Sequence, residues 1–345
     1  MTDANQPTHT HRDAPATAPS SNATDSDSRP DPLPIDAVEA LCSDVRANVS
    51  RVIVGNEDVI EHVVTALLGR GHVLLEDVPG VGKTVLARSI ARSIDCTFKR
   101  VQFTPDLLPS DITGVNVFNQ KTREFEFNEG PIFANIVLAD EINRAPPKTQ
   151  AALLEAMEES QVTVDGATRP LPTPFTVIAT QNAVEPTRTY DLPFAEIDRF
   201  TKKLHLGYPD EDEETELLGR TVGHHPIESL EPVTDLESVV RARETVANVA
   251  VKEPVRAYAT RLVGYTREHA HIGASPRGSI ALLRAAQARA AADGREYVVP
   301  DDVKREAPVV LSHRIKPSPA GTGTDRGERD GASIVEDALE TVRVE

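Results

Sequence analysis

An apolar run followed by a glycine-rich turn and the start of a helix constrains this chain more than any other segment. Residues 73–75 are Val-Leu-Leu, and the turn that follows contains Gly80 and Gly82 before Lys83 and Thr84. In such a segment the backbone N–H groups of the turn face the phosphates of a nucleoside triphosphate. We expect the Lys83 ammonium to reach the β- and γ-phosphates and the Thr84 hydroxyl to bind Mg²⁺. The sequence therefore predicts a site for ATP or GTP.

Two details of this segment bear on the prediction. The general pattern G-x-x-x-x-G-K-[ST] begins with glycine, whereas its first position here is Asp77, so a chance glycine-rich turn is the alternative. Lys83 lies in the first turn of a helix, where the helix dipole opposes a cation. A bound anion is the natural compensation, and the correct placement of the remaining residues favours the phosphate site.

A second apolar run, residues 136–139, is followed at once by Asp140 and Glu141. In open α/β sheets ligands bind beyond the carboxyl ends of the strands, so both carboxylates are placed beside the phosphates. We expect Asp140 to hold the Mg²⁺ shell and Glu141, on the opposite side of the strand, to orient and polarise an attacking water. An ordinary strand-to-helix cap is the alternative, but the pair follows the phosphate segment and so favours hydrolysis.

The charge balance indicates the class of partner. The chain of 345 residues has 54 Asp and Glu against 37 Lys and Arg, a formal charge of −17, and only 9 of its basic residues are Lys. This excess repels nucleic acid and anionic membranes, and the scarcity of Lys suggests a salt-rich cytoplasm as a hypothesis. The two cysteines, Cys42 and Cys96, are too few for a disulfide framework or a zinc site and are expected to pack in the core.

The N-terminal segment and the apolar runs indicate where the protein works. Residues 1–34 are rich in Thr, Asp, Ser, Pro, Asn and Ala, and a disordered acidic tail is predicted there. No apolar run reaches spanning length, and the N-terminus lacks the core of a signal peptide. We therefore expect a cytoplasmic protein without membrane insertion.

Strands alternate with helices after this tail. Apolar runs at 73–75, 98–103, 136–139 and 175–179 predict a mostly parallel sheet covered on both faces by helices, an α/β fold. The turn at 53–55 lies where adenine is bound in such folds, although plain apolar packing is the alternative.

Beyond Pro209 the alternation of strands and helices gives way to a smaller all-α region. The expected divisions are a tail (1–34), an α/β core (35–207), a helical lid (208–315), and a linker with a short C-terminal helix (316–345).

Two β-hairpins are predicted inside the core. Residues 114–127 contain two alternating segments around a polar turn, and residues 162–171 contain a second pair around Asp165 and Gly166. Neither hairpin is needed to complete the sheet. They are either edge decoration or moving fingers that touch a partner or substrate.

Three further polar residues are candidates for the same chemistry. Asn182 follows the fourth strand and would reach the γ-phosphate or the attacking water, although Asn is also an ordinary turn residue there. Arg199 ends a short helix begun by Pro193, where the helix dipole also favours a cation. Arg277 lies in the first turn of a helix that Ser275 caps, so either a phosphate oxygen or a nearby Asp is its expected partner.

Taken in order, these residues resemble the AAA+ ATPases, and more narrowly the MoxR-like family, over most of residues 36–315. The resemblance is carried by LEDVPGVGKT (75–84), DEINRAPPKTQAALLEAM (140–157), ATQN (179–182), DRF (198–200) and GASPR (273–277). The segment GASIVEDAL (331–339) also resembles the short C-terminal helix of that family.

The resemblance implies a role for each candidate. It makes Asp77 an ordinary variant of the phosphate loop, Asn182 sensor 1, Arg199 the arginine finger and Arg277 sensor 2. The hairpin at 114–127 would be the family's insert in its second helix, and the second one its pre-sensor hairpin. The implied cofactors are ATP and Mg²⁺. The expected nucleotide-binding residues are Val54, Gly55, Val78, Pro79, Gly80, Val81, Gly82, Lys83, Thr84 and Val85.

The resemblance also implies partners. Members of the family are described as chaperone-like ATPases that commonly act with proteins carrying a von Willebrand factor A domain. We therefore expect a homo-oligomeric ring of six subunits that remodels a protein partner. Ala183 stands where the family often has Pro, and Phe194 where Glu is frequent; these changes concern only the loop that would contact a partner.

Two other classes compete with this hypothesis. A nucleic-acid motor or helicase loader shares the same ATP core, but the charge of −17 and the lack of a Lys- or Arg-rich segment argue against it. A nucleotide-dependent scaffold that barely hydrolyses ATP is disfavoured by the combined presence of Asp140, Glu141 and Arg199.

Overall fold

The computed structural model describes residues 30–182, 190–222, 226–318 and 330–344. The predicted disordered tail lies outside the described residues up to residue 29, and so does Ala183. Residues 30–34 form neither helix nor strand, and the first helix begins at Ile35. No helix in the described part of the chain has the length and apolar character that a bilayer crossing requires.

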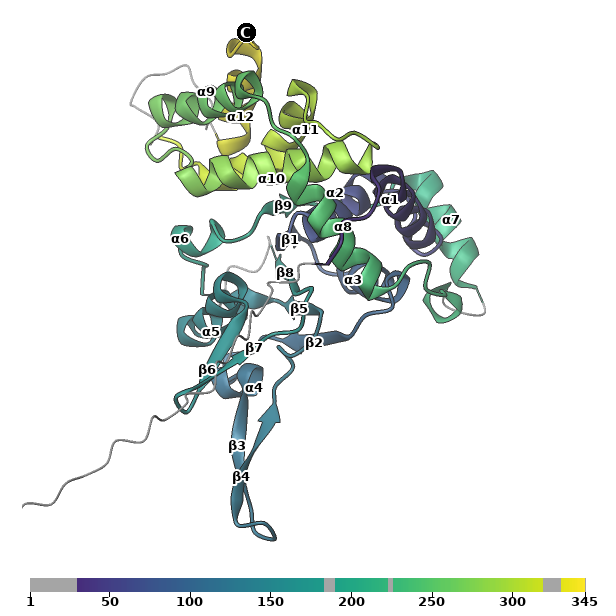
Figure 1. Ribbon diagram of the computed structural model, residues 1–345, viewed down its shortest axis with the longest axis vertical. Helices are drawn as coiled ribbons and strands as arrows, with labels where there is room; N and C mark the ends of the chain where they lie inside the picture. Colours follow the sequence, from purple (N-terminus) through teal and green to yellow (C-terminus); the bar gives the residue numbers. More distant parts are fainter. Residues whose placement is uncertain (1–29, 183–189, 223–225, 319–329, 345) are drawn as a thin grey trace, which may run out of the picture.

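A five-stranded parallel sheet forms the centre of the α/β core (Figure 1). The four predicted strands are present, and the α/β prediction is confirmed. A fifth strand, which was not predicted, pairs with the first predicted strand and forms one edge of the sheet. In spatial order the strands are β2 (Phe98–Gln102), β5 (Ile136–Asp140), β8 (Thr176–Asn182), β1 (Val73–Asp77) and β9 (Lys202–Leu204).

Alternate residues of each strand enter different apolar clusters, which shows that both faces of the sheet are covered. Val73 and Leu75 of β1 join the cluster that contains helices α1 (Ile35–Ser50), α2 (Glu57–Leu68) and α3 (Lys83–Ser93). Leu74 joins the cluster that contains α5 (Pro147–Glu159). Strands β5 and β8 divide their residues in the same way. Parallel strands that are buried on both faces have continuous apolar sequences, and these four strands could therefore be predicted from the sequence.

Helices of the core pack on the two faces and lead into and out of the strands. Both α1 and α2 precede the sheet, and α3 follows β1 directly. The core helices are α1 (Ile35–Ser50), α2 (Glu57–Leu68), α3 (Lys83–Ser93), α4 (Pro109–Thr113), α5 (Pro147–Glu159) and α6 (Phe194–Ile197), with a 3₁₀ turn, η1 (Ile142–Arg144).

Both predicted hairpins are separate two-stranded sheets. The pair β3 (Gly114–Asn119) and β4 (Glu124–Glu129) projects away from the body of the molecule (Figure 1). The pair β6 (Gln161–Val164) and β7 (Ala167–Pro170) turns at Asp165 and Gly166, which have φ angles of 51° and 82°. This turn is the conformation that the Asp-Gly sequence favours.

In the described residues beyond β9, helices and short turns follow, joined by two isolated β-bridges, and no further strand is formed, as predicted. The helices and turns are α7 (Glu211–Thr221), η2 (Pro226–Ser229), α8 (Leu236–Asn248), α9 (Glu253–His269), α10 (Pro276–Ala292), α11 (Pro300–Leu311), η3 (Ser312–Arg314) and α12 (Gly331–Thr341). Buried residues of α8 to α12 share one cluster with those of α1, α2 and α3, so the helical region packs directly on the core. Cys42 belongs to this cluster and Cys96 packs against it; burial raises the pKa of each thiol to about 12.

Candidate nucleotide site

The carboxyl ends of four strands meet at one edge of the sheet. Strand pairing places Asp77 opposite Asn182, and Gln102 opposite Asp140. Between these two pairs, β5 lies beside β8. The phosphate loop, both predicted carboxylates and the predicted sensor amide are therefore brought together at this edge.

The loop between β1 and α3 is shaped by two glycines. Gly80 and Gly82 have φ angles of 92° and 95°, which L-residues with side chains rarely adopt. A Cβ atom at either position would meet no described atom within 4 Å, so the space beside the loop is open. Gly82 caps α3, whose first residues are Lys83 and Thr84. The loop thus leaves room for phosphates at the amino end of a helix.

The Lys83 side chain lies over its own loop. Its Nζ donates hydrogen bonds to the backbone oxygens of Asp77 (3.0 Å) and Val78 (2.8 Å). Burial lowers the pKa of Lys83, while Asp77, Asp140 and Glu141 oppose that shift. Lys83 is therefore close enough to the three carboxylates to interact with them electrostatically, as the predicted site requires.

Asp77, which replaces the glycine of the general loop pattern, stabilises the loop through hydrogen bonds. Its Oδ2 accepts hydrogen bonds from the backbone N–H groups of Leu206 (2.6 Å) and Gly207 (2.9 Å), and its Oδ1 accepts one from Val78 (3.0 Å). The carboxylate thus fixes the start of the phosphate loop to the segment that leaves β9. A glycine could not make these contacts.

Asp140 is buried and held by two partners. Its Oδ1 accepts a hydrogen bond from Thr180 Oγ1 (2.6 Å), and its Oδ2 pairs with Arg100 Nε (2.9 Å) and Nη2 (2.5 Å). Thr180 Oγ1 also accepts from the backbone N–H of Glu141 at 2.8 Å. One threonine on β8 therefore contacts both the Asp140 carboxylate and the backbone of Glu141.

Glu141 follows β5 in the left-handed backbone conformation, with a φ of 57°. Such a backbone is uncommon for a residue with a side chain, and it is found disproportionately at active sites. Oε1 accepts from Asn182 Nδ2 (2.9 Å), and Oε2 accepts from Gln102 Nε2 (2.6 Å) and Arg144 Nη1 (2.7 Å). The carboxylate predicted to polarise water is thus oriented by three side chains, one of which is the predicted sensor.

The sequence prediction missed four of these partners: Arg100, Gln102, Arg144 and Thr180. Two of them lie on β2, where they alternate with residues of the opposite face, and the pairing of β2 with β5 aligns them with the carboxylates. Strand alternation could have placed them on the correct face, but only the order of the strands shows that β2 borders β5.

The turn predicted to lie near adenine packs against the phosphate-loop helix. Val52 forms a small apolar cluster with Ile227 and Leu230, and Val85 of α3 packs against it. Gly55 has a φ of 67°, and a Cβ atom there would collide with the Glu213 carboxylate of α7. Val52, which precedes the predicted turn, therefore lies near Val85, and the contact of Val54, Gly55 and Val85 with adenine stays a prediction.

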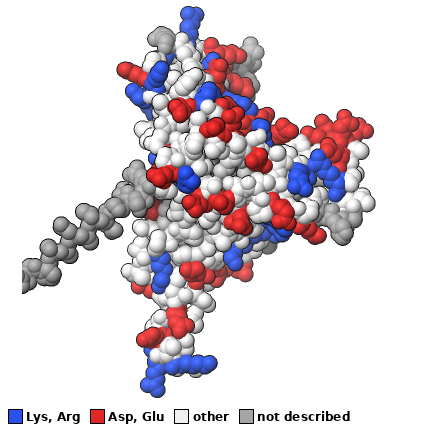
Figure 2. Space-filling view, turned by 45° about the vertical axis from the view of Figure 1, so that its right-hand side comes forward, with Lys and Arg blue, Asp and Glu red and all other residues white. Residues whose placement is uncertain are grey.

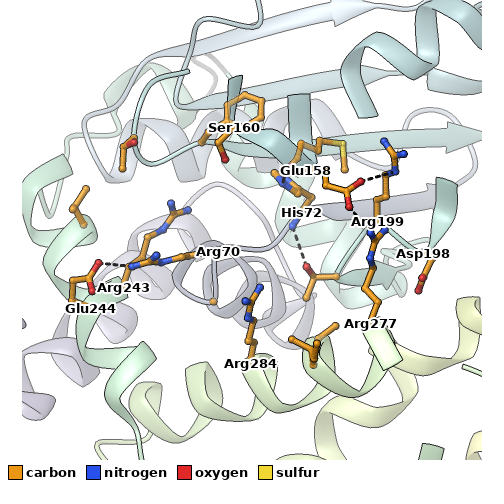
Figure 3. Close-up of a pocket in the computed structure, with 18 of the residues that line it drawn as sticks. Arg70, His72, Glu158, Ser160, Asp198, Arg199, Arg243, Glu244, Arg277 and Arg284 are labelled. Carbon is orange, nitrogen blue, oxygen red and sulfur yellow. Dashed lines mark hydrogen bonds and ion pairs between the residues drawn. The ribbon is translucent and has the colours of Figure 1, made fainter. Parts of the chain in front are cut away.

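Arg199 and Arg277 lie together in a different part of the molecule. Both pair with the carboxylate of Glu158, Arg199 through Nε at 3.5 Å, and Arg199 also pairs with Glu196 at 3.1 Å. They line a cavity of about 550 Å³, and the phosphate-loop residues and Asp140 are absent from its described lining. Figure 3 shows both arginines pointing toward Glu158. The structure thus separates these two candidates from Lys83. Of the two partners expected for Arg277, a phosphate oxygen stays a prediction, and the carboxylate that it contacts is a Glu rather than an Asp.

The donor set at the sheet edge fits Mg²⁺. The cation prefers a few oxygen ligands from the protein and completes its shell with phosphate oxygens and water. Thr84 and Asp140 would supply such oxygens. No group of three or more His, Cys, Asp or Glu side chains in the described residues forms a cage that would hold a metal without a nucleotide.

Binding at the loop can be tested by thermal stability. Mg²⁺-ATP should raise the melting temperature of the protein, because ligand at about 100 times its dissociation constant stabilises by roughly 2.7 kcal/mol. Lys83→Ala should abolish the increase in differential scanning fluorimetry, whereas Lys304→Ala, which changes an exposed lysine of α11, should retain it. An unchanged shift in Lys83→Ala would remove Lys83 from the site.

Comparisons with known proteins agree with this geometry. Residues 72–202 match the model of the ATPase family associated with various cellular activities (AAA), and residues 265–337 match the AAA lid domain. The chain is 54% identical to the uncharacterized protein YeaC of Bacillus subtilis over 78% of this chain and 84% of that protein. It is 43% identical to Chaperone MoxR1 of Mycobacterium tuberculosis, over 77% and 73% of the two chains. A crystal structure of a candidate ATPase from Cytophaga hutchinsonii superposes with a TM-score of 0.82 at 37% identity, over 90% of this chain and 97% of that one.

Proposed function

This chain belongs to the MoxR family of AAA ATPases, and on that premise we propose that it uses ATP hydrolysis, with Mg²⁺, to remodel protein partners as a ring of six subunits. The observation that carries the ring is the separation of Arg199 from Lys83. Hydrolysis of a phosphoanhydride needs cations at the γ-phosphate, and an arginine finger that lies away from its own phosphate loop can reach only the nucleotide of a neighbouring subunit. Within one subunit Glu158 holds this arginine instead.

We assign the steps of hydrolysis to residues of the sheet edge. The loop N–H groups and Lys83 bind the phosphates, while Thr84 and Asp140 would hold Mg²⁺, which offsets the charge that develops on the phosphoryl oxygens. Glu141 accepts the proton of the attacking water as a general base. Asn182, Gln102 and Arg144 keep its carboxylate in one orientation.

Glu141→Gln should bind ATP and hydrolyse it at least about a hundredfold more slowly, the range expected for loss of a general base. The amide keeps the shape of the side chain but cannot accept the proton. Phosphate release and the ATP-induced melting shift measure turnover and binding separately. A matched change, Glu159→Gln at the exposed end of α5, should leave both unchanged. Turnover near the wild-type rate in Glu141→Gln would contradict the assignment.

We assign partner contact to the β3–β4 hairpin. Phe118 and Phe125 stack edge to face at 5.3 Å and remain 49% and 72% exposed, and Val117 beside them is also exposed. Figure 2 shows basic side chains at the tip of this hairpin, whereas acidic side chains are spread over much of the rest of the visible face. Exposed aromatic residues on a projecting hairpin suit a protein surface.

The partner can be tested by binding in high salt. Glu141→Gln loaded with ATP should retain a von Willebrand factor A domain protein from the same cell, because a stalled ring cannot complete its cycle. Phe118→Ser with Phe125→Ser should lose that protein while ATP hydrolysis alone continues.

The nucleic-acid motor is tested in parallel with single- and double-stranded DNA. Salt-sensitive DNA binding tighter than about 10⁻⁶ M would favour that class instead.

A further inference from the structure

The cavity that contains Arg199 and Arg277 has an unusual charge for so acidic a protein. Its described lining includes six arginines, three carboxylates and no lysine. The arginines are Arg70, Arg199, Arg243, Arg277, Arg284 and Arg314. The chain as a whole carries a formal charge of −17, so a cavity with three more guanidinium groups than carboxylates is a local reversal of sign.

The three carboxylates leave part of this charge unpaired. Asp198 pairs with Arg314 at 2.7 Å, Glu158 is shared by Arg199 and Arg277, and Glu244 pairs with Arg70. Among the described residues, Arg243 and Arg284 have no carboxylate partner. The unpaired charge therefore collects on α8 and α10, at the end of the cavity away from Glu158.

Arg243 is the strongest evidence for a ligand at this end. Its exposed fraction is 5%, and within the described part of the chain its guanidinium donates only to two neutral acceptors, Leu67 O (2.8 Å) and Thr176 Oγ1 (3.0 Å). Burial, together with the nearby Arg70, lowers the pKa of Arg243 to about 9. A buried cation without a counter-charge is costly, and it is usually retained where an anion completes the site.

Figure 3 shows how the arginines are arranged. Arg70 and Arg243 lie together on one side, Arg199 and Arg277 lie on the other, and Arg284 rises from α10 between them. A second hollow of about 290 Å³ is lined by Arg70, Arg243 and Arg284. The Arg243 end of the cavity thus adjoins a further hollow that Arg199 and Arg277 do not line.

We propose that Arg70, Arg243 and Arg284 form a binding site for a phosphate-chain anion, distinct from the phosphate loop and from the Arg199–Arg277 pair. Arginine, unlike lysine, presents a planar fork that pairs with two phosphate oxygens at once, and all basic groups in the described lining are arginines. Arg243 supplies a fixed, desolvated fork at the base of the site. Arg284, exposed on α10, supplies a second guanidinium from another helix of the lining.

Inorganic pyrophosphate is the probe, and isothermal titration calorimetry at constant ionic strength is the measurement. All proteins carry Lys83→Ala, so that the phosphate loop does not contribute. Arg284→Gln should weaken pyrophosphate binding roughly 10- to 100-fold, the range for loss of one charge-assisted pair. Arg243→Lys, which keeps the charge but removes the fork, should also weaken it. Arg256→Gln, a change at an exposed arginine of α9, should not.

The outcomes separate the subsites and the sources of the anion. Equal affinities for pyrophosphate and ADP would assign the site to the phosphate chain alone, and tighter binding of ADP would assign it to a nucleotide. The proposal is overturned if neither Arg284→Gln nor Arg243→Lys changes the affinity, if pyrophosphate does not bind, or if only Arg277→Gln weakens binding. Because Arg284 is exposed, its variant should fold even if Arg243→Lys does not.

Discussion

Arg199→Ala should lower ATP turnover by about 10³- to 10⁵-fold while leaving ATP binding intact. An arginine supplied across a subunit boundary is worth that much in other phosphoryl-transfer systems, because it stabilises charge that develops only in the transition state. Steady-state phosphate release measures the loss, and the ATP-induced melting shift shows that binding remains. Arg256→Ala, at an exposed arginine of α9, is the matched control and should keep its activity.

Mixing two inactive variants decides whether Arg199 acts in trans. In a mixed ring of Arg199→Ala and Lys83→Ala subunits, some intact phosphate loops receive Arg199 from a neighbour, so activity should partly return. Specific activity of the wild-type protein should likewise rise with protein concentration. If light scattering shows mixed oligomers and no activity returns, Arg199 acts within its own subunit and the ring mechanism is wrong.

On the proposed ring mechanism, Glu158 would hold Arg199 between turnovers. Glu158 pairs with Arg199 and Arg277 in the isolated subunit. A γ-phosphate from a neighbour must compete with this carboxylate for the same guanidinium groups. Arg199→Ala should reduce ATP turnover in the assembled protein, whereas Glu158→Gln should not. This difference would distinguish a residue that only holds Arg199 from a residue that takes part in catalysis.

The residues whose positions in the fold could be predicted from the sequence are those whose neighbours in the chain determine their place. Lys83 and Thr84 must begin the helix after the glycine turn, and Asp140 and Glu141 must follow a buried strand. Parallel strands end at one edge, so their positions followed from local pattern alone. The turn at Asp165 was predictable for the same reason.

Contacts between distant segments were not predictable in this way. The short β9 strand reads Lys-Lys-Leu, which has no strand pattern, and only its pairing with β1 makes it part of the sheet. Glu158 was missed because a carboxylate at the end of a helix is ordinarily solvated. Its role depends on α10, which lies more than a hundred residues later in the chain.

Buried charge was the largest omission. Lys202 of β9, Arg289 of α10 and Glu306 of α11 are 0%, 1% and 0% exposed, although charged residues on strands and helices usually face solvent. Glu306 pairs with Lys202 Nζ at 2.7 Å and with Arg289 Nη2 at 2.9 Å. Lys202 also donates to Thr65 Oγ1 at 2.7 Å, and Arg289 pairs with Glu61 of α2. This network joins the edge of the sheet to the helical region.

Glu306→Gln should destabilise the protein by about 3–5 kcal/mol, because removing one partner of a buried ion pair leaves Lys202 and Arg289 without their counter-charge. Urea unfolding at neutral pH measures the loss. Asp301→Asn, which removes an exposed ion pair with Lys304 on the same helix, is the matched control and should cost little. An equal cost for the two changes would show that the network does not hold the helical region on the sheet.

The network also predicts how stability depends on pH. Burial alone would raise the pKa of Glu306, but Lys202, His62 and Arg289 outweigh burial and hold that pKa far below its usual value of 4.5. A carboxylate with a depressed pKa stabilises the fold above its unfolded pKa, and this contribution is lost as the pH falls below about 4.5 toward the folded pKa. The free energy of unfolding of the wild-type protein should therefore fall more steeply below pH 4.5 than that of Glu306→Gln, when urea unfolding is repeated across this range. Parallel curves for the two proteins would mean that Glu306 is not ionised in the folded state, and that the ion pairs do not join the sheet to the helical region.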